Sequence, residues 1–322
     1  MIEGRMKRIL VTGAAGQIGS ELTIALRHVY GEANVIAADR RQPDAELLQS
    51  GPFCSIDVRE AASLTQVASE HRVDTIFHLA SVLSAVAEQK PQLAWEINMG
   101  GLHKALEAAR QYGCAVFFPS SIGAFGPGTP LENTPQVTVQ RPNTIYGITK
   151  LAGELLCDYY YHRFGVDVRG LRLPGLISYK TLPGGGTTDY AVEIFYSAIR
   201  EGRYLCFLKR DTRLDMMYMP DAIHAVMALM EADGGRLIHR NAYNVTAMNF
   251  TPEELAAQIH MSIPGFSIEY DVDPIRQAIA DSWPRYMDDS AARAEWGWEP
   301  RYDIAATTRE MLAHLAVKLG KP

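Results

Sequence analysis

The sequence predicts an α/β fold: a doubly wound parallel sheet with a smaller mixed α/β lobe at its C-terminal side. Three observations predict it. In the first half, short apolar runs rich in β-branched and aromatic residues alternate with longer helical patterns, which is typical of βαβ units. A glycine-rich turn joins the first such run to the first helical pattern. After about Leu173 the alternation ends, and the run Pro183-Gly184-Gly185-Gly186 breaks the chain.

The alternation predicts six strands and four helices in the first half. We expect the strands at residues 8–12, 34–38, 53–57, 74–80, 115–120 and 168–173. We expect the helices at residues 17–30, 60–71, 93–112 and 145–164. Because a parallel sheet is covered by helices on both faces, these strands read as nearly continuous apolar runs.

The remainder of the chain predicts the smaller lobe. Residues 6–180 are expected to form the first domain, to which residues 211–235 return as a strand and a helix. Residues 181–210 and 236–322 are expected to form the lobe. Within it, Thr251-Pro252-Glu253-Glu254 is a capping box with proline at the first helical position, so a helix is predicted there. Residues 1–5 are interpreted as a protease-recognition scar left by expression, with Met6 as the natural start.

The composition limits the classes of partner. The chain has 322 residues, of which 47% are hydrophobic and 21% charged, and a formal net charge of -6, as in an ordinary soluble protein. The sequence has no basic stripe that would indicate a nucleic-acid partner, and no uncharged apolar run reaches the roughly 18 residues needed to span a membrane. No secretory signal is evident. The four cysteines lie far apart without metal-ligand spacing, so we expect no metal and a reducing, cytoplasmic location.

The glycine-rich turn predicts a dinucleotide site. Gly13 permits a tight turn, Gly16 lets a pyrophosphate approach the backbone, and Gly19 lets helix and strand pack closely. Gln17 and Ile18 begin the helix, whose free N–H groups favour phosphate. The sequence therefore predicts that residues 6–180 form a Rossmann-type domain.

An acidic residue indicates which dinucleotide is bound. Asp39 ends the second predicted strand, 20 residues after Gly19. A carboxylate there accepts hydrogen bonds from the ribose 2′-hydroxyl and repels a 2′-phosphate, which favours NAD over NADP. Arg40 and Arg41 point the other way, because arginine can accommodate that phosphate; the carboxylate is weighed more heavily. The following strand ends predict further cofactor contacts, or ordinary loop structure, at Asp57, Val58, Leu79, Ala80 and Ser81.

Tyr146 and Lys150 predict the catalytic chemistry. They lie four residues apart, so on a helix their side chains share one face. A phenol is a poor base at neutral pH, but an adjacent ammonium and a positively charged nicotinamide favour phenolate. Tyr146 can then accept a proton from a substrate hydroxyl while hydride leaves for the cofactor. Ser121, at the end of the fifth predicted strand, can hold the substrate oxygen.

These elements together resemble the extended short-chain dehydrogenase/reductase superfamily, which includes sugar-nucleotide epimerases. Longer strings resemble one family within it, the L-threonine 3-dehydrogenases of the short-chain type. The resemblance extends from Lys7 to the C-terminus, and the strings that carry it are Leu83-Ser84-Ala85, Ala94-Trp95-Glu96-Ile97-Asn98-Met99, Pro119-Ser120-Ser121-Ile122-Gly123-Ala124-Phe125-Gly126, Pro183-Gly184-Gly185-Gly186-Thr187-Thr188-Asp189-Tyr190-Ala191, Met216-Met217-Tyr218 and Ser282-Trp283-Pro284.

The resemblance implies a reaction and further site residues. The family oxidises the 3-hydroxyl of L-threonine with NAD, giving L-2-amino-3-oxobutyrate. Carried over, Tyr146 is the base, Lys150 its electrostatic partner and Ser121 the hydroxyl contact. The amino-acid end of the substrate would lie among Ser84, Thr188 and Asp189. The nicotinamide side would be lined by Asn98 and by the turn Leu173-Pro174-Gly175.

The resemblance also implies a homodimer formed through residues 93–112 and 145–164. Two other functions stay open at this point. One is a sugar-nucleotide epimerase or dehydratase on the same scaffold, although the small, hydroxyl-rich Thr187-Thr188-Asp189 segment favours a compact substrate. The other is a non-catalytic NAD-binding regulator, which the intact Tyr146, Lys150 and Ser121 disfavour.

Overall fold

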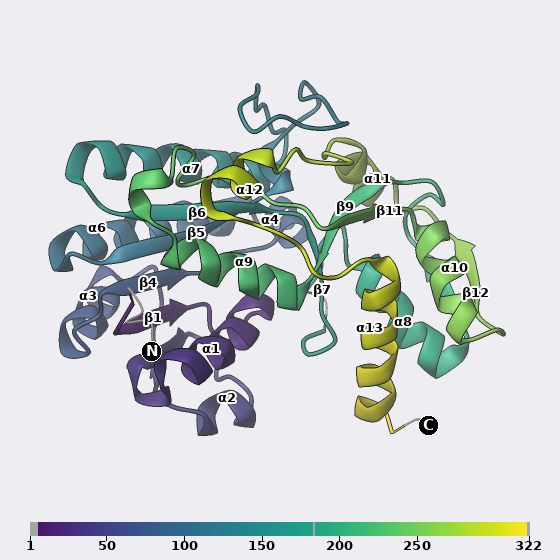
Figure 1. Ribbon diagram of the computed structural model, residues 1–322, viewed down its shortest axis with the longest axis horizontal. Helices are drawn as coiled ribbons and strands as arrows, with labels where there is room; N and C mark the ends of the chain where they lie inside the picture. Colours follow the sequence, from purple (N-terminus) through teal and green to yellow (C-terminus); the bar gives the residue numbers. More distant parts are fainter. Residues whose placement is uncertain (1–5, 183, 321–322) are drawn as a thin grey trace.

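The computed structural model describes residues 6–182 and 184–320. A seven-stranded parallel sheet, of order β10-β6-β5-β4-β1-β2-β3, forms its centre (Figure 1). Its strands are β1 (Ile9–Thr12), β2 (Val35–Asp39), β3 (Phe53–Ser55), β4 (Thr75–His78), β5 (Ala115–Ser121), β6 (Val168–Leu173) and β10 (Tyr243–Asn244). The Rossmann-type fold predicted from the sequence is confirmed, with each of the six predicted strands shifted at its ends by no more than a few residues.

Helices cover both faces of this sheet. Side chains alternate along each strand, so Ile9 and Leu10 enter different cores. The core that contains Ile9 includes α1 (Gln17–Tyr30) and α9 (Met219–Glu231). The core that contains Leu10 includes α3 (Ala61–Glu70), α6 (Leu102–Tyr112) and α7 (Ile145–Phe164). The carboxyl ends of the strands are thereby left as the accessible edge.

The helix predicted over residues 93–112 is interrupted. The chain forms α4 (Ser84–Gln89), α5 (Pro91–Trp95) and a π-helical segment (Glu96–Gly101) before α6 begins. A Cβ at Gly101 would lie 3.0 Å from the Val58 side chain, so the chain passes close to the loop after β3. Periodicity did not predict this π-helical segment, because its residues lie in one continuous helical stretch of the sequence.

The smaller sheets lie beside the central one. β7 (Gly175–Ile177) and β9 (Leu214–Tyr218) are parallel, and β11 (Met248–Phe250) is antiparallel to β9; β8 (Arg203–Cys206) pairs with β12 (Ser267–Tyr270). Their helices are α8 (Tyr190–Glu201), α10 (Pro252–Ser262), α11 (Pro274–Asp281) and α13 (Ile304–Lys318). Two further short helices, α2 (Ala45–Gln49) and α12 (Ser290–Trp296), pack nearer the central sheet. The capping box predicted at Thr251 is formed.

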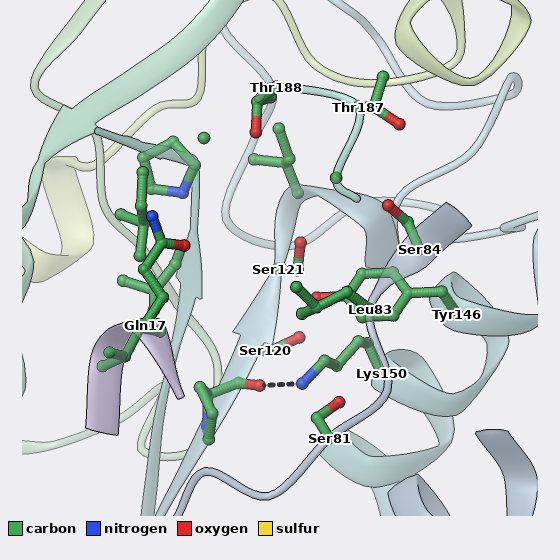
Figure 2. Close-up of a pocket in the computed structure, with 18 of the residues that line it drawn as sticks. Gln17, Ser81, Leu83, Ser84, Ser120, Ser121, Tyr146, Lys150, Thr187 and Thr188 are labelled. Atoms are coloured by element: carbon green, nitrogen blue, oxygen red, sulfur yellow. Dashed lines mark hydrogen bonds between the residues drawn. The ribbon is translucent and has the colours of Figure 1, made fainter. Parts of the chain in front are cut away.

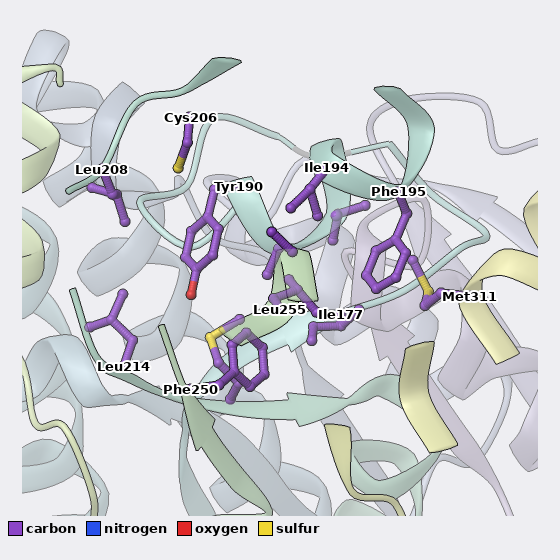
Figure 3. Close-up of a cluster of buried hydrophobic side chains, with 14 of the residues drawn as sticks. Ile177, Tyr190, Ile194, Phe195, Cys206, Leu208, Leu214, Phe250, Leu255 and Met311 are labelled. Atoms are coloured by element: carbon purple, nitrogen blue, oxygen red, sulfur yellow. The ribbon is translucent and has the colours of Figure 1, made fainter. Parts of the chain in front are cut away.

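This region has its own core. Figure 3 shows Tyr190, Ile194 and Phe195 of α8 facing Phe250, Leu255 and Met311 from three other elements. Residues far apart in sequence therefore assemble one apolar cluster next to the segment that precedes α8. That cluster fixes the position of Thr187-Thr188-Asp189 relative to the central sheet.

Segments after residue 180 are shared between the two regions. In the returning segment, α9 packs on the central sheet, whereas β9 pairs with β7 and β11. β10, from the range assigned to the lobe, adds the edge strand beside β6. The division into two domains stays a prediction, and its proposed scar at residues 1–5 lies outside the described residues, as does Pro183. Among the described helices, none combines the length and apolarity needed to cross a membrane.

Candidate active site

The glycine turn has the geometry that a bound dinucleotide requires. Gly13 has φ +72°, and a Cβ there would lie 2.6 Å from the amide nitrogen of Ala80. A Cβ on Gly19 would lie 2.8 Å from the Cα of Ala14. Both positions therefore exclude a side chain. Helix α1 begins at Gln17 after Gly16, and no side chain caps it, so its first N–H groups suit the phosphates of a dinucleotide.

Asp39 lies beside this turn at the end of β2. Its Oδ2 accepts a hydrogen bond from the Ala15 N–H at 3.0 Å, and its Oδ1 accepts one from the Arg41 N–H at 2.8 Å. The Arg41 side chain is 66% exposed and lies 3.7 Å from the same carboxylate. The Asp39 carboxylate is thus held next to the glycine turn, in a position that fits the adenosine ribose of NAD.

Two ionisable residues follow or end the next two strands, Asp57 after β3 and His78 at the end of β4, and they differ in charge. Asp57 forms a bidentate pair with Arg59, which holds the pKa of Asp57 down at about 2. His78 is buried in β4, with its Nδ1 3.0 Å from the Thr12 hydroxyl. Burial lowers the pKa of His78 to about 3, so this ring is neutral and packs inside the sheet.

A cavity opens at the carboxyl ends of β4, β5 and β6, and Figure 2 shows its side chains converging. Thirteen of the residues predicted for the site line it: Gln17, Ile18, Leu79, Ser81, Ser84, Ser121, Tyr146, Lys150, Leu173, Pro174, Gly175, Thr188 and Asp189. The other predicted residues lie outside its lining: Gly13, Gly16, Gly19, Asp39, Asp57, Val58, Ala80 and Asn98.

Several lining residues were given no role from the sequence. They are Leu83, Ile122, Leu176, Thr187 and Trp283. Trp283 comes from a loop that follows α11, more than a hundred residues after Tyr146. The Thr187 hydroxyl is buried and has no hydrogen-bond partner among the described residues. Periodicity does not signal that these positions meet, since only the tertiary fold brings them to the cavity.

Tyr146 and Lys150 face the cavity from the first turns of α7. Thr144 caps this helix by accepting from the Gly147 N–H, which places Tyr146 in its first turn. Burial raises the pKa of Tyr146, and a hydrogen bond with Ser121 partly offsets the rise. The buried phenol therefore loses its proton less readily than in water, and formation of the phenolate depends on nearby positive charge.

Lys150 supplies that charge. Its Nζ donates a hydrogen bond to the Pro119 carbonyl at 2.7 Å and lies 5.4 Å from the centre of the Tyr146 ring. It also lies 5.1 Å from the centre of the Phe118 ring. Burial lowers the pKa of Lys150 to about 8, and nearby Glu154 opposes that shift. The amine is thus charged at neutral pH and close to its titration range.

Asp189 and Asn98 already have protein partners. The Asp189 carboxylate accepts hydrogen bonds from the N–H groups of Gly185 at 2.8 Å and Gly186 at 2.6 Å, while burial raises the pKa of its carboxyl. Asn98, in the π-helical segment, bonds through its side chain to the backbone of Val82 and to the hydroxyls of Ser81 and Thr149. Asn98 therefore ties the loop after β4 to α7.

The described residues contain no group of three or more histidine, cysteine, aspartate or glutamate side chains arranged to hold a metal ion. The polar groups that line the cavity include a phenol, an amine, hydroxyls and the Asp189 carboxylate.

Comparisons with known proteins agree with this geometry. Solved L-threonine dehydrogenases are similar to the chain along nearly its whole length. The one from Clostridium difficile is 56% identical with a TM-score of 0.95, covering 97% of this chain and 98% of that one. The holo form of the GalE-like enzyme from Cupriavidus necator is 50% identical with a TM-score of 0.93, covering 96% and 99%.

An uncharacterised epimerase/dehydratase of Staphylococcus saprophyticus is 55% identical over 308 residues, which are 95% of this chain and 96% of the relative. The sequence profile of the NAD dependent epimerase/dehydratase family matches residues 9–246. Together with the phosphate turn, the strand-end carboxylate and the buried phenol–amine pair, this match identifies the chain as an NAD-dependent enzyme that belongs to the NAD-dependent epimerase/dehydratase family.

Proposed function

We propose that the chain oxidises the 3-hydroxyl of L-threonine with NAD, giving L-2-amino-3-oxobutyrate. One observation carries the proposal: Tyr146, Lys150 and Ser121 line the same cavity as Thr188 and Asp189. The similarity to solved L-threonine dehydrogenases at about half identity supports it. When bound, NAD supplies the acceptor for the hydride that leaves the substrate carbon.

Tyr146 acts as the base in this proposal. Its phenolate accepts the proton of the threonine hydroxyl, which Ser121 holds by a hydrogen bond, and the oxygen becomes a carbonyl as the hydride departs. Burial disfavours the charged phenolate, and the nearby Lys150 ammonium stabilises it. Lys150 is itself oriented by its hydrogen bond to the Pro119 carbonyl. In addition, the amine can hold the nicotinamide ribose.

The amino-acid end of the substrate is assigned to Ser84, Thr188 and Asp189. Ser84 comes from α4, and the other two precede α8, so the substrate would bridge the two regions. The glycine amides fix the orientation of the Asp189 carboxylate, which can face an ammonium group. Hydroxyl groups and backbone amides suit the carboxylate end.

The cofactor contacts are proposed from the positions of the glycine turn and the strand ends. The pyrophosphate is assigned to the α1 N-terminus and the ribose to Asp39. The proposed NAD contacts are Gly13, Gly16, Gln17, Ile18, Gly19, Asp39, Asp57, Val58, Leu79, Ala80, Ser81, Asn98, Tyr146, Lys150 and Leu173. Asn98 would contribute by holding the loop after β4, given its bonds to Ser81 and Val82.

An activity assay tests the function. The purified protein is incubated with NAD and L-threonine, serine or short 3-hydroxy acids, and the absorbance of reduced nicotinamide is followed. We expect the fastest reduction with L-threonine. Turnover of a UDP-sugar without any reaction of threonine would instead establish the epimerase alternative. NAD binding without oxidation of any of these substrates would favour the non-catalytic regulator.

We also propose that the protein works as a cytoplasmic homodimer. Ile148, Leu155 and Tyr159 are large apolar side chains that share one face of α7, and they are 41%, 62% and 54% exposed. Trp95, at the end of α5, is 50% exposed. These residues fall within the two helical stretches expected at the dimer interface, and a second copy would remove them from water.

A further inference from the structure

A buried ion pair lies directly behind the proposed catalytic lysine. Glu154 is on α7 one turn after Lys150, and Arg172 is on β6. The Arg172 Nη2 donates to Glu154 Oε2 at 2.8 Å, and its Nε donates to Oε1 at 3.0 Å. The two side chains are only 4% and 7% exposed. Removing either partner would leave the other charge buried and unpaired.

The pair is linked to the cavity through β5. Ser120 lines the cavity, and its hydroxyl donates to Glu154 Oε1 at 2.5 Å. The preceding residue, Pro119, accepts the Lys150 hydrogen bond. The end of one strand therefore holds both the Lys150 amine and the Glu154 carboxylate.

The remaining ionisable groups around Lys150 are few. Tyr146 lies on the same helix, and His78 faces it from β4 as a neutral ring. From the packed helix α4, Glu88 bonds to the Ile145 N–H; from α6, Glu107 bonds to Tyr160 at the far end of α7. Neither of these carboxylates bonds to Lys150, so among the described residues Glu154, one turn away and paired with Arg172, is the charge placed to influence the amine.

We propose that Glu154 is a positioning residue whose carboxylate, balanced by Arg172, sets the protonation state of Lys150 and so the pH range in which Tyr146 can act as base. The effect on the pH range of catalysis rests on the proposed function, but the effect on the protonation of Lys150 does not. A carboxylate one turn away stabilises the ammonium, whereas the guanidinium opposes it. Ser120 keeps the carboxylate oriented toward the strand end.

The test is a direct titration of the Lys150 amine. Its Cε resonance is followed by carbon-13 NMR in the cofactor-free protein and assigned with the Lys150→Arg variant. We expect Glu154→Gln to lower the midpoint by about one pH unit, as for a unit charge at a partly screened distance, and Arg172→Gln to raise it by less, because Arg172 acts on the far side of Glu154. The double variant should return it toward the wild-type value.

Further variants control for structural damage. Ser120→Ala removes the hydroxyl but keeps both charges, so it should shift the Lys150 midpoint by much less than Glu154→Gln does. If the single variants fail to fold, Gln140→Glu adds a negative charge at a half-buried position beside Arg172, to which Gln140 already bonds. That variant should raise the midpoint.

The outcomes separate this inference from the proposed function. Opposite shifts in Glu154→Gln and Arg172→Gln, with the alkaline limb of kcat/KM following each, support it. Midpoints that stay fixed, or move in the same direction in both variants, overturn it, because a purely structural pair would alter stability alone. A protein that does not oxidise threonine fails the proposed function yet still reports the lysine titration.

Discussion

The Nζ of Lys150 donates to the carbonyl of Pro119 at 2.7 Å, and it does so beneath a tyrosine whose ring centre is 5.4 Å away. This hydrogen bond fixes the position of the buried Lys150 ammonium beside the Tyr146 side chain. Because burial opposes both the lysine cation and the tyrosine anion, each charge favours the other. This mutual dependence leads to the first prediction.

Tyr146→Phe is expected to reduce the rate of threonine oxidation by at least about a hundredfold, because it removes the proton acceptor and little else. NADH binding, measured by fluorescence titration, should be nearly unchanged. Tyr159→Phe, on an exposed face of the same helix, is the matched control and should retain activity. Wild-type turnover in Tyr146→Phe would exclude this phenol as the base.

Gly13→Ala is expected to weaken NAD binding by more than about tenfold and to destabilise the protein, since the new methyl group would meet the backbone of Ala80. Gly113→Ala is a close control: its φ is also +72°, but nothing lies within 4 Å of the added Cβ. That variant should lose about 1 kcal/mol from the strained backbone alone and keep its NAD affinity. Calorimetry and thermal melting measure the two effects.

Asp39→Ser is expected to narrow the preference for NAD over NADP by about tenfold or more, because the carboxylate no longer repels a 2′-phosphate. The exposed Arg41 side chain beside it can then meet that phosphate. The ratio of kcat/KM for the two cofactors gives the answer. Asp44→Ser, which keeps a capping side chain at the start of α2, should leave the ratio alone; an unchanged ratio in Asp39→Ser contradicts the assignment.

Asp215 is expected to make stability depend on pH. It is fully buried on β9, bonds to Thr246 and to the Met287 N–H, and burial raises its pKa to about 8. Between the unfolded pKa near 4 and the folded value, the folded state holds a proton that the unfolded state has lost. Stability therefore falls as pH rises across this window, by at most about 1.4 kcal/mol per pH unit.

Asp215→Asn should flatten that slope, because the amide stays neutral in both states and can still bond to Thr246 and Met287. Urea unfolding at several values between pH 5 and pH 8 measures the free energy of unfolding for both proteins. Equal slopes in the two proteins would falsify the assignment of this pH dependence to Asp215.

Leu155→Glu is expected to convert the proposed dimer to monomers, since it places a charge at the centre of the apolar face of α7. Val317→Glu changes a residue of α13 that is 84% exposed and serves as the control, with no effect on mass. Light scattering after size-exclusion chromatography reports the oligomeric state. A monomeric wild-type protein would contradict the proposed dimer.

Local sequence was enough for much of the fold and for the central chemistry. Strand and helix positions follow from periodicities within about twenty residues, which is why Gln17–Tyr30, Ile145–Phe164 and Val168–Leu173 match their predicted bounds. Likewise, Tyr146 and Lys150 share a helix face because four residues complete about one turn. The glycine turn is specified by steric conditions at Gly13 that the strand–turn–helix pattern already implies.

Only the tertiary structure decided which distant groups meet. It brings Trp283 and Thr187 to the cavity and buries Glu154 against Arg172 one helical turn from Lys150. It also pairs β9 with β7 outside the central sheet. A local pattern records which face of an element is apolar, but the identity of the partner is set by packing across long loops, where many pairings satisfy the same pattern.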